Sequence, residues 1–123
     1  MAAKVYLIFG DEYLVSVKAR ELIDTLVPQE KRTFGLEIID GNSENVESAI
    51  RMADSCREAV QTLGFMGDGK VVWFRDVNFL HDNVTGKSQD VKERVDRLAG
   101  LIGKGLPDGQ VLVITAVKVD KRY

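Results

Sequence analysis

The sequence has few of the residues that form covalent cross-links, metal sites or membrane anchors. Its 123 residues include one cysteine, Cys56, and one histidine, His81. A single thiol cannot form an internal disulfide, and no set of thiols is present to bind zinc, so a secreted disulfide scaffold and a zinc-finger module are excluded. The apolar run over residues 5–9 stops at Gly10, far short of the roughly 20 apolar residues that cross a bilayer. We therefore expect a cytoplasmic protein with no membrane partner.

An excess of charge of either sign is also missing. Lys and Arg number 17 against 19 Asp and Glu, a formal net charge of -2. This balance is too even to require nucleic acid or an anionic membrane as a partner. Hydrophobic residues make up 45% of the chain and charged residues 29%, which is the composition of a folded globular protein of one domain. A multidomain enzyme within this chain is excluded.

The apolar pattern alternates between strand and helix periods along the chain. Residues 5–9 form a continuous apolar run, which is typical of a central strand covered on both faces. The expected strands are 5–9, 36–39, 71–74 and 111–114, and the expected helices run from Asp11 to Pro28, from the N-cap Ser43 to Gly64, and from about 90 to 102. This alternation favours an α/β domain with a mostly parallel sheet, flanking helices and right-handed crossovers.

Each expected helix has one apolar face, which we expect to be buried. These faces consist of Leu14, Val15, Leu22, Ile23 and Leu26; of Val46, Ala49, Ile50, Ala53, Cys56, Val60 and Leu63; and of Val91, Val95, Leu98 and Ile102. Cys56 is therefore interpreted as a small core residue, whereas His81 falls in a polar loop over about 78–89. Because the two side chains are placed apart, we expect no catalytic Cys–His pair.

The first strand-to-helix turn, Phe9-Gly10-Asp11-Glu12-Tyr13, lies where a parallel sheet usually holds a phosphate. A phosphate-binding loop needs several glycines, a lysine and a Ser or Thr hydroxyl. This turn has one glycine and two carboxylates, which repel a nucleotide. Asp11 and Glu12 complement the dipole at a helix start, and the alternative is a carboxylate pair for a metal ion or for proton transfer.

Two further segments have part of a nucleotide-binding signature. Thr85-Gly86-Lys87-Ser88 has the closing half of a phosphate loop, but the opening glycine falls at position 81, which is His81. Asp76 follows the third strand as a magnesium-binding acid does in nucleotide hydrolases, but Arg75 stands directly after the apolar run. We therefore expect no catalytic residues, no cofactor and no metal ion. The alternative is a nucleotide-binding enzyme domain that uses Gly86, Lys87 and Ser88.

The segment Leu63-Gly64-Phe65-Met66-Gly67-Asp68-Gly69 places large apolar side chains between glycines, at a tip between a helix and a strand. Such tips are normally polar. Phe65 and Met66 can fold back onto the sheet, or they can be presented as a hydrophobic anchor for a partner. Burial of one such side chain in a partner's pocket is worth about 1.5–3 kcal/mol, so two can dominate a small interface.

Three stretches carry a resemblance to a known family. They are the start of the chain from Val5 to Leu14, the segment 63–66 with the strand 71–74, and Val119-Asp120-Lys121-Arg122. In their order and spacing, over essentially all 123 residues, the chain resembles the N-terminal domain of the delta subunit of the bacterial DNA polymerase III clamp loader. The resemblance implies an AAA+-like (P-loop NTPase-like) fold that has no functional phosphate loop. It also implies that residues 1–123 are a clamp-binding domain, truncated before the last strand, the helical lid and the collar domain.

The same resemblance implies a role in DNA replication. Family members bind and open the beta sliding clamp for loading onto primed DNA without hydrolysing ATP themselves, as subunits of a DNA-directed DNA polymerase, a nucleotidyltransferase. Bulky apolar residues after the long helix enter a pocket on the clamp, and by position Phe65 matches best, with Leu63 and Met66 as supporting contacts. Gly64 stands where the family often has a second bulky residue.

The partners implied by the resemblance are the beta sliding clamp, other clamp-loader subunits and, within the complex, DNA. A stand-alone α/β adaptor with a different partner is the remaining alternative.

Overall fold

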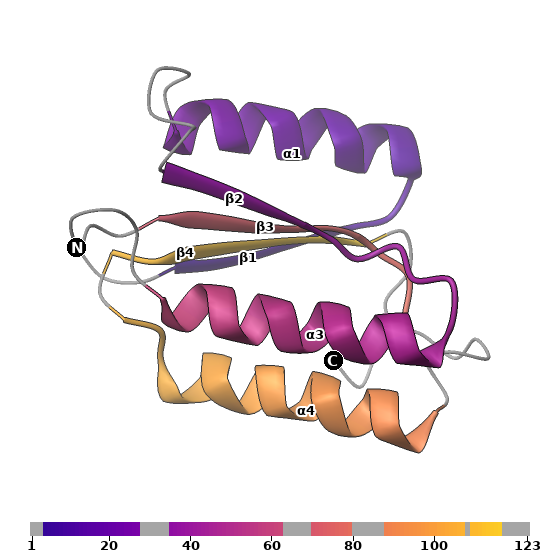
Figure 1. Ribbon diagram of the computed structural model, residues 1–123. Helices are drawn as coiled ribbons and strands as arrows, with labels where there is room; N and C mark the ends of the chain where they lie inside the picture. The colour runs from indigo at the N-terminus through magenta and orange to yellow at the C-terminus, as the bar shows by residue number, and fades with distance from the viewer. Residues whose placement is uncertain (1–3, 28–34, 63–69, 80–87, 108, 117–123) are drawn as a thin grey trace.

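A four-stranded parallel sheet organises the chain in the computed structural model (Figure 1). The structure describes residues 4–27, 35–62, 70–79, 88–107 and 109–116. The strands are β1 (Lys4–Phe9), β2 (Leu36–Asp40), β3 (Val71–Val77) and β4 (Val111–Ala116), and they lie in the order β1-β4-β3-β2. The predicted α/β class, parallel sheet and four strand positions are confirmed.

Helices cover both faces of this sheet. Helix α1 (Glu12–Leu26) lies on one face, and α3 (Val46–Gln61) and α4 (Gln89–Lys104) lie side by side on the other (Figure 1). The three predicted helices are confirmed, with ends within a few residues of those expected. No helix in the described part of the chain is both long enough and apolar enough to cross a membrane.

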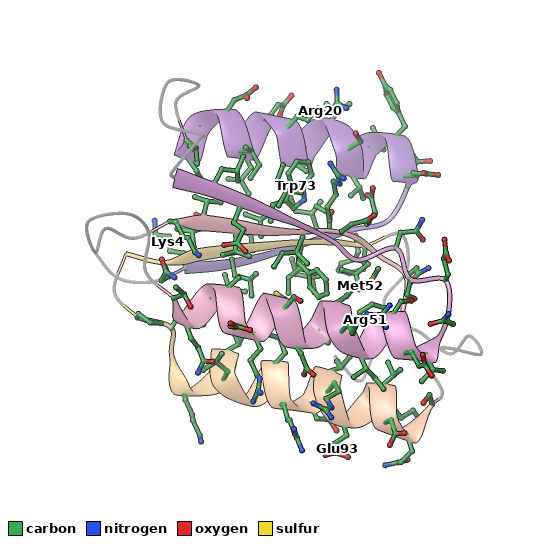
Figure 2. All side chains as sticks on the ribbon, in the orientation of Figure 1. Lys4, Arg20, Arg51, Met52, Trp73 and Glu93 are labelled. Carbon is green, nitrogen blue, oxygen red and sulfur yellow. The ribbon has the colours of Figure 1, made fainter. Side chains whose placement is uncertain are left out.

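Two hydrophobic clusters join the layers, because successive residues of a strand point to opposite faces. The larger cluster lies between the sheet and the α3/α4 layer and includes Val72, Phe74 and Leu112. The smaller one lies against α1 and includes Ile23, Val71 and Val113. Figure 2 shows Trp73 on the α1 side of the sheet and Met52 on the α3 side. Strands β3 and β4 are therefore covered on both faces.

In the described part of the sheet, residues 5–9 do not form the central strand that their apolar run predicts. β1 lies at the edge of the described sheet, and Val5, Leu7 and Phe9 are 39%, 41% and 58% exposed. Tyr6 and Ile8 pack in the cluster with α1, so the exposed side chains point to the face that carries α3 and α4. An apolar run shows that a strand is suited to burial on both faces, but its place in the sheet decides what covers it.

Two predictions of local detail are also wrong. Leu14, expected on the buried face of its helix, is 61% exposed. The N-cap of α3 is Asn45 rather than Ser43: the Asn45 side chain accepts from Ser48 N at 2.8 Å, and Ser48 Oγ accepts from Asn45 N at 3.2 Å. Ser43 instead donates from its hydroxyl to Asn78 Oδ1 at 2.7 Å, a contact between distant parts of the chain.

Cys56 is a core residue of α3, as its position in the apolar pattern predicts. Its exposed fraction is 0%. Burial, with a smaller contribution from the negative charge of Glu37, raises the pKa of the thiol to about 12. The thiolate is the reactive form of cysteine, so Cys56 is chemically quiet in the folded protein.

We predict that Cys56 resists alkylation by iodoacetamide at mildly alkaline pH until the protein unfolds. Its pKa is raised from an ordinary value of 9.0 to about 12, so above about pH 9 the unfolded chain loses this proton first and the folded state is progressively destabilised. Urea denaturation over a pH series measures the effect, and Cys56→Ala serves as the control because it lacks this component of the pH dependence. Rapid alkylation of the folded protein would contradict the assignment.

Candidate functional site

The carboxyl edge of the sheet, where the parallel strands end, is the usual place for a ligand in such folds. Gly10 follows β1 with φ 131°, a conformation that glycine adopts readily. Asp11 then caps α1, and its carboxylate accepts from Leu14 N at 3.1 Å. A carboxylate therefore occupies the helix N-terminus at which a nucleotide-binding turn would hold a phosphate.

Other polar groups at this edge are engaged by the protein itself. Asn78 Nδ2 donates to Asn42 Oδ1 at 2.8 Å and to Ser43 O at 2.9 Å, and Asn78 Oδ1 accepts from Ser43 N at 3.0 Å. Gly41 N donates to Arg75 O at 2.7 Å, and a Cβ on Gly41 would lie 2.6 Å from Val77 Cγ2. This close approach requires glycine, and the network fixes the turn after β2 against the end of β3.

The end of β3 carries the acid that sequence analysis compared with a magnesium ligand. Asp76 is exposed, has φ 55°, and donates from its backbone N to Thr115 Oγ1 at 3.1 Å. Trp73 Nε1 donates to the same buried hydroxyl oxygen, also at 3.1 Å. Within the described ranges, no group of three or more His, Cys, Asp or Glu side chains could hold a metal ion.

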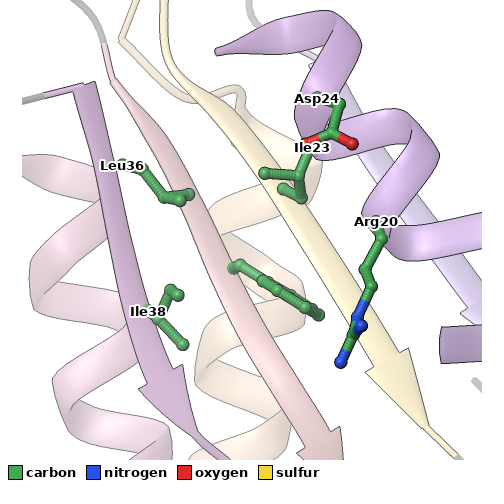
Figure 3. Close-up of a pocket in the computed structure, with 6 residues that line it drawn as sticks. Arg20, Ile23, Asp24, Leu36 and Ile38 are labelled. Carbon is green, nitrogen blue, oxygen red and sulfur yellow. The ribbon is translucent and has the colours of Figure 1, made fainter. Parts of the chain in front are cut away.

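An open groove of about 630 Å³ lies on the α1 face of the sheet, between α1 and β2 (Figure 3). It is lined by Arg20, Ile23, Asp24, Leu36, Ile38 and Trp73. The Arg75 guanidinium lies over the Trp73 ring, 5.7 Å from its centroid, close enough for a cation–π contact. Sequence analysis missed this groove; its only signal is that Leu36, Ile38 and Trp73 are large apolar residues on one sheet face.

The predicted anchor residues Leu63, Phe65 and Met66 lie outside the described residues, but both flanks of their segment are described. Helix α3 ends at Gln61 with Thr62 as its C-cap, and β3 begins at Val71. Because α3 runs opposite to the strands, its end and the start of β3 lie at the amino edge of the sheet (Figure 1). The flanks of the segment are therefore at the end of the sheet opposite to Asp11 and Asp76.

One buried side chain joins these two flanks. Gln110, which is 0% exposed, donates from Nε2 to Val60 O and to Thr62 O, each at 3.0 Å. Its Oε1 accepts from Lys70 N at 2.7 Å. Sequence analysis missed Gln110 because a polar residue directly before an apolar run looks like part of a loop.

A cationic groove of about 440 Å³ lies at the same edge, between the last turns of α3 and α4. Its lining consists of Arg57, Gln61, Arg97, Gly100, Leu101 and Lys104. Arg97 pairs with Glu93 at 2.6 Å. Arg57 Nε is buried and has no hydrogen-bond partner in the described part of the chain. This surface suits an anionic partner.

The residues of the alternative nucleotide site are only partly described. Gly86, Lys87 and His81 lie outside the described residues. Ser88 stands at the N-cap position of α4, where its side chain makes no capping hydrogen bond and its backbone O accepts from Lys92 N at 2.9 Å.

The described residues define an α/β domain on a parallel sheet, with open grooves on the α1 face and between α3 and α4. A buried glutamine ties the end of α3 to the residue before β3. The sequence matches the family model of DNA polymerase III, delta subunit, over residues 6–123. The chain belongs to this delta-subunit family, as its resemblance predicts. The fold is similar to that of the Bacillus subtilis DNA clamp loader delta protein (YqeN), with a TM-score of 0.61 and 24% sequence identity.

That similarity covers 97% of this chain and 33% of the Bacillus subtilis chain. The chain therefore spans about a third of the length of that protein. A search of curated protein sequences finds no significant match.

We predict that Asp11→Ala lowers the free energy of unfolding by about 1 kcal/mol, because it leaves Leu14 N without its side-chain acceptor. Asp11→Asn keeps such an acceptor and is expected to retain most of the stability. Urea denaturation of the three proteins measures the difference. Equal stabilities would show that Asp11 is not needed as a cap and would reopen a ligand-binding role for it.

Proposed function

We propose that this chain binds the beta sliding clamp and opens it for loading onto primed DNA during replication, without itself hydrolysing ATP. The observation that carries the proposal is membership of the delta-subunit family over residues 6–123. The family is a component of DNA polymerase III, so other clamp-loader subunits, and DNA within the complex, are the further proposed partners.

We assign the clamp contact to the segment after α3, with Phe65 as the anchor and Leu63 and Met66 as supporting contacts. Two features of the amino edge support this assignment. Gln110 ties both flanks of the segment to the sheet, and the adjacent groove carries Arg57, Arg97 and Lys104. Apolar anchors dominate the energy of an interface, whereas complementary charge around them steers and orients the partner.

Clamp opening requires only binding energy in this proposal. A surface that binds the open form of the clamp more tightly than the closed form shifts the population toward the open form by that difference in affinity. No nucleotide chemistry in this chain is needed for that shift. The Asp11 carboxylate at the start of α1, where a phosphate would be held, supports the absence of ATP hydrolysis.

We further propose that residues 1–123 are the AAA+-like, clamp-binding domain of a longer protein, without the lid and collar domains. The position of β1 supports this: among the described strands it pairs with β4 alone, and its exposed Val5, Leu7 and Phe9 suit cover by further chain. Unpaired sheet edges are normally protected in native proteins.

We predict that Phe65→Ala weakens binding to the cognate beta clamp by at least about 1 kcal/mol, roughly fivefold, while the fold stays intact, as expected of an exposed anchor. Isothermal calorimetry measures the affinity, and circular dichroism checks the fold. Phe9→Ala is the matched control, because Phe9 is a phenylalanine that is 58% exposed on β1. Unchanged affinity of Phe65→Ala would reject this anchor, and unfolding would instead assign Phe65 to the core.

A separate test concerns the nucleotide-binding alternative. We expect calorimetric titration with Mg-ATP to show no saturable binding, because Asp11 and Glu12 place negative charge at the turn where phosphates bind. Saturable micromolar binding that is lost in Lys87→Ala would contradict this expectation and favour a site formed by Gly86, Lys87 and Ser88.

A further inference from the structure

The side chain of Gln110 makes hydrogen bonds that its position directly before β4 does not require. It precedes β4, and its backbone is already held there: Gln110 O accepts from Lys4 N at 3.1 Å, and Gln110 N donates to Pro107 O at 3.1 Å. The side chain is fully buried and reaches in the other direction, to α3 and to the residue before β3. Most buried side-chain polar atoms have hydrogen-bond partners; here the amide nitrogen of Gln110 has two and the amide oxygen has one.

The hydrogen-bond partners of the Gln110 side chain lie on both sides of segment 63–69. Its Nε2 donates to Val60 O and Thr62 O, carbonyls at the helix end that have no acceptor role within α3. Its Oε1 accepts from Lys70 N, the last amide before β3. The side chain of Lys70 is held as well, since Lys70 Nζ lies 2.7 Å from Glu37 Oε1 and is 9% exposed. Segment 63–69 therefore begins and ends at points fixed by a single buried side chain.

We propose that Gln110 is a positioning residue for clamp binding, which holds the two described flanks of segment 63–69, Thr62 and Lys70, in place at the amino edge. This inference rests on the proposed function. A binding segment with fixed ends has less conformational freedom to lose when it meets its partner, so the affinity is higher than for a segment with loose ends. Gln110 itself touches no clamp atom in this proposal.

The experiment compares substitutions at two buried polar residues, Gln110 directly before β4 and Thr115 within it. Gln110→Leu removes the side-chain hydrogen bonds at the amino edge. Thr115→Val is the matched control, because Thr115 is 1% exposed and accepts from Trp73 Nε1 and Asp76 N at the carboxyl edge. Each variant loses the hydrogen bonds of one buried polar side chain, but only Gln110→Leu acts on the flanks of segment 63–69. Affinity for the cognate clamp is measured by calorimetry, at a temperature where thermal unfolding shows both variants to be folded.

We expect Gln110→Leu to weaken clamp binding about tenfold or more and Thr115→Val to leave it within about twofold, at a similar loss of thermal stability. If Gln110→Leu does not fold, Gln110→Glu replaces it, since it keeps an acceptor for Lys70 N and loses the donors to Val60 O and Thr62 O. Unchanged affinity, or an equal loss in Thr115→Val, would overturn the proposal, since a purely structural role predicts one of these results.

A second measurement separates this inference from the proposed function. Amide hydrogen exchange of Lys70 in the free protein is expected to be faster in Gln110→Leu than in Thr115→Val, because only the former removes the acceptor of that amide. If the wild-type chain does not bind the clamp, the proposed function and the positioning role both fail, whatever the exchange result. If the wild type binds and Lys70 exchange is unchanged in Gln110→Leu, the positioning role alone fails.

Discussion

Parallel pairing of β3 with β4 is the constraint on which the rest of the structure depends. The two strands align from Val71 opposite Val111 to Val77 opposite Ala116, with a shift in register between Phe74 and Val77. Both are covered on both faces by the two hydrophobic clusters. Parallel strands cannot be joined by a tight hairpin, so each connection crosses the sheet, here by way of a helix. Two features follow from this parallel pairing. Helices cover the faces of the sheet, and all strands begin at one edge of the sheet (the amino edge) and end at the opposite one (the carboxyl edge).

That separation gives the two edges of the sheet different chemistry. At the carboxyl edge, polar groups are used within the protein: Asp11 caps α1, Asn78 binds the turn after β2, and Thr115 accepts from two donors of β3. At the amino edge, Gln110 ties the end of α3 to Lys70, the residue before β3, beside a groove with three cationic side chains. A ligand site would ordinarily be sought at the first edge, whereas the proposed clamp contact belongs to the second. A protein that acts by binding a large partner needs a presented surface rather than a phosphate pocket.

The candidate site could be predicted from the sequence only in part. The apolar residues between glycines in segment 63–69 stand out because loop tips are normally polar. The acidic first turn predicts that Asp11 complements the dipole of a helix start, and the structure adds that its carboxylate caps α1. Gln110, the Trp73 groove and the cationic groove were missed. Gln110 bonds to residues 40 to 50 positions away, and each groove is lined by residues from separate elements. Contacts between residues so far apart in the chain produce no regular spacing of residue types, so they cannot be predicted from local sequence patterns.

The sequence by itself determined the four strands, the three helices, the parallel α/β class and the burial of Cys56, because these follow from apolar periods within a single element. The sequence also identified the family, through motifs spread along the chain. Only the tertiary structure decided the order of the strands, and with it the exposure of Val5, Leu7 and Phe9 on an edge strand. It likewise decided that Asn45 rather than Ser43 caps α3, because Asn78 engages Ser43. Local patterns specify what an element can bury, whereas its neighbours in space decide what it does bury.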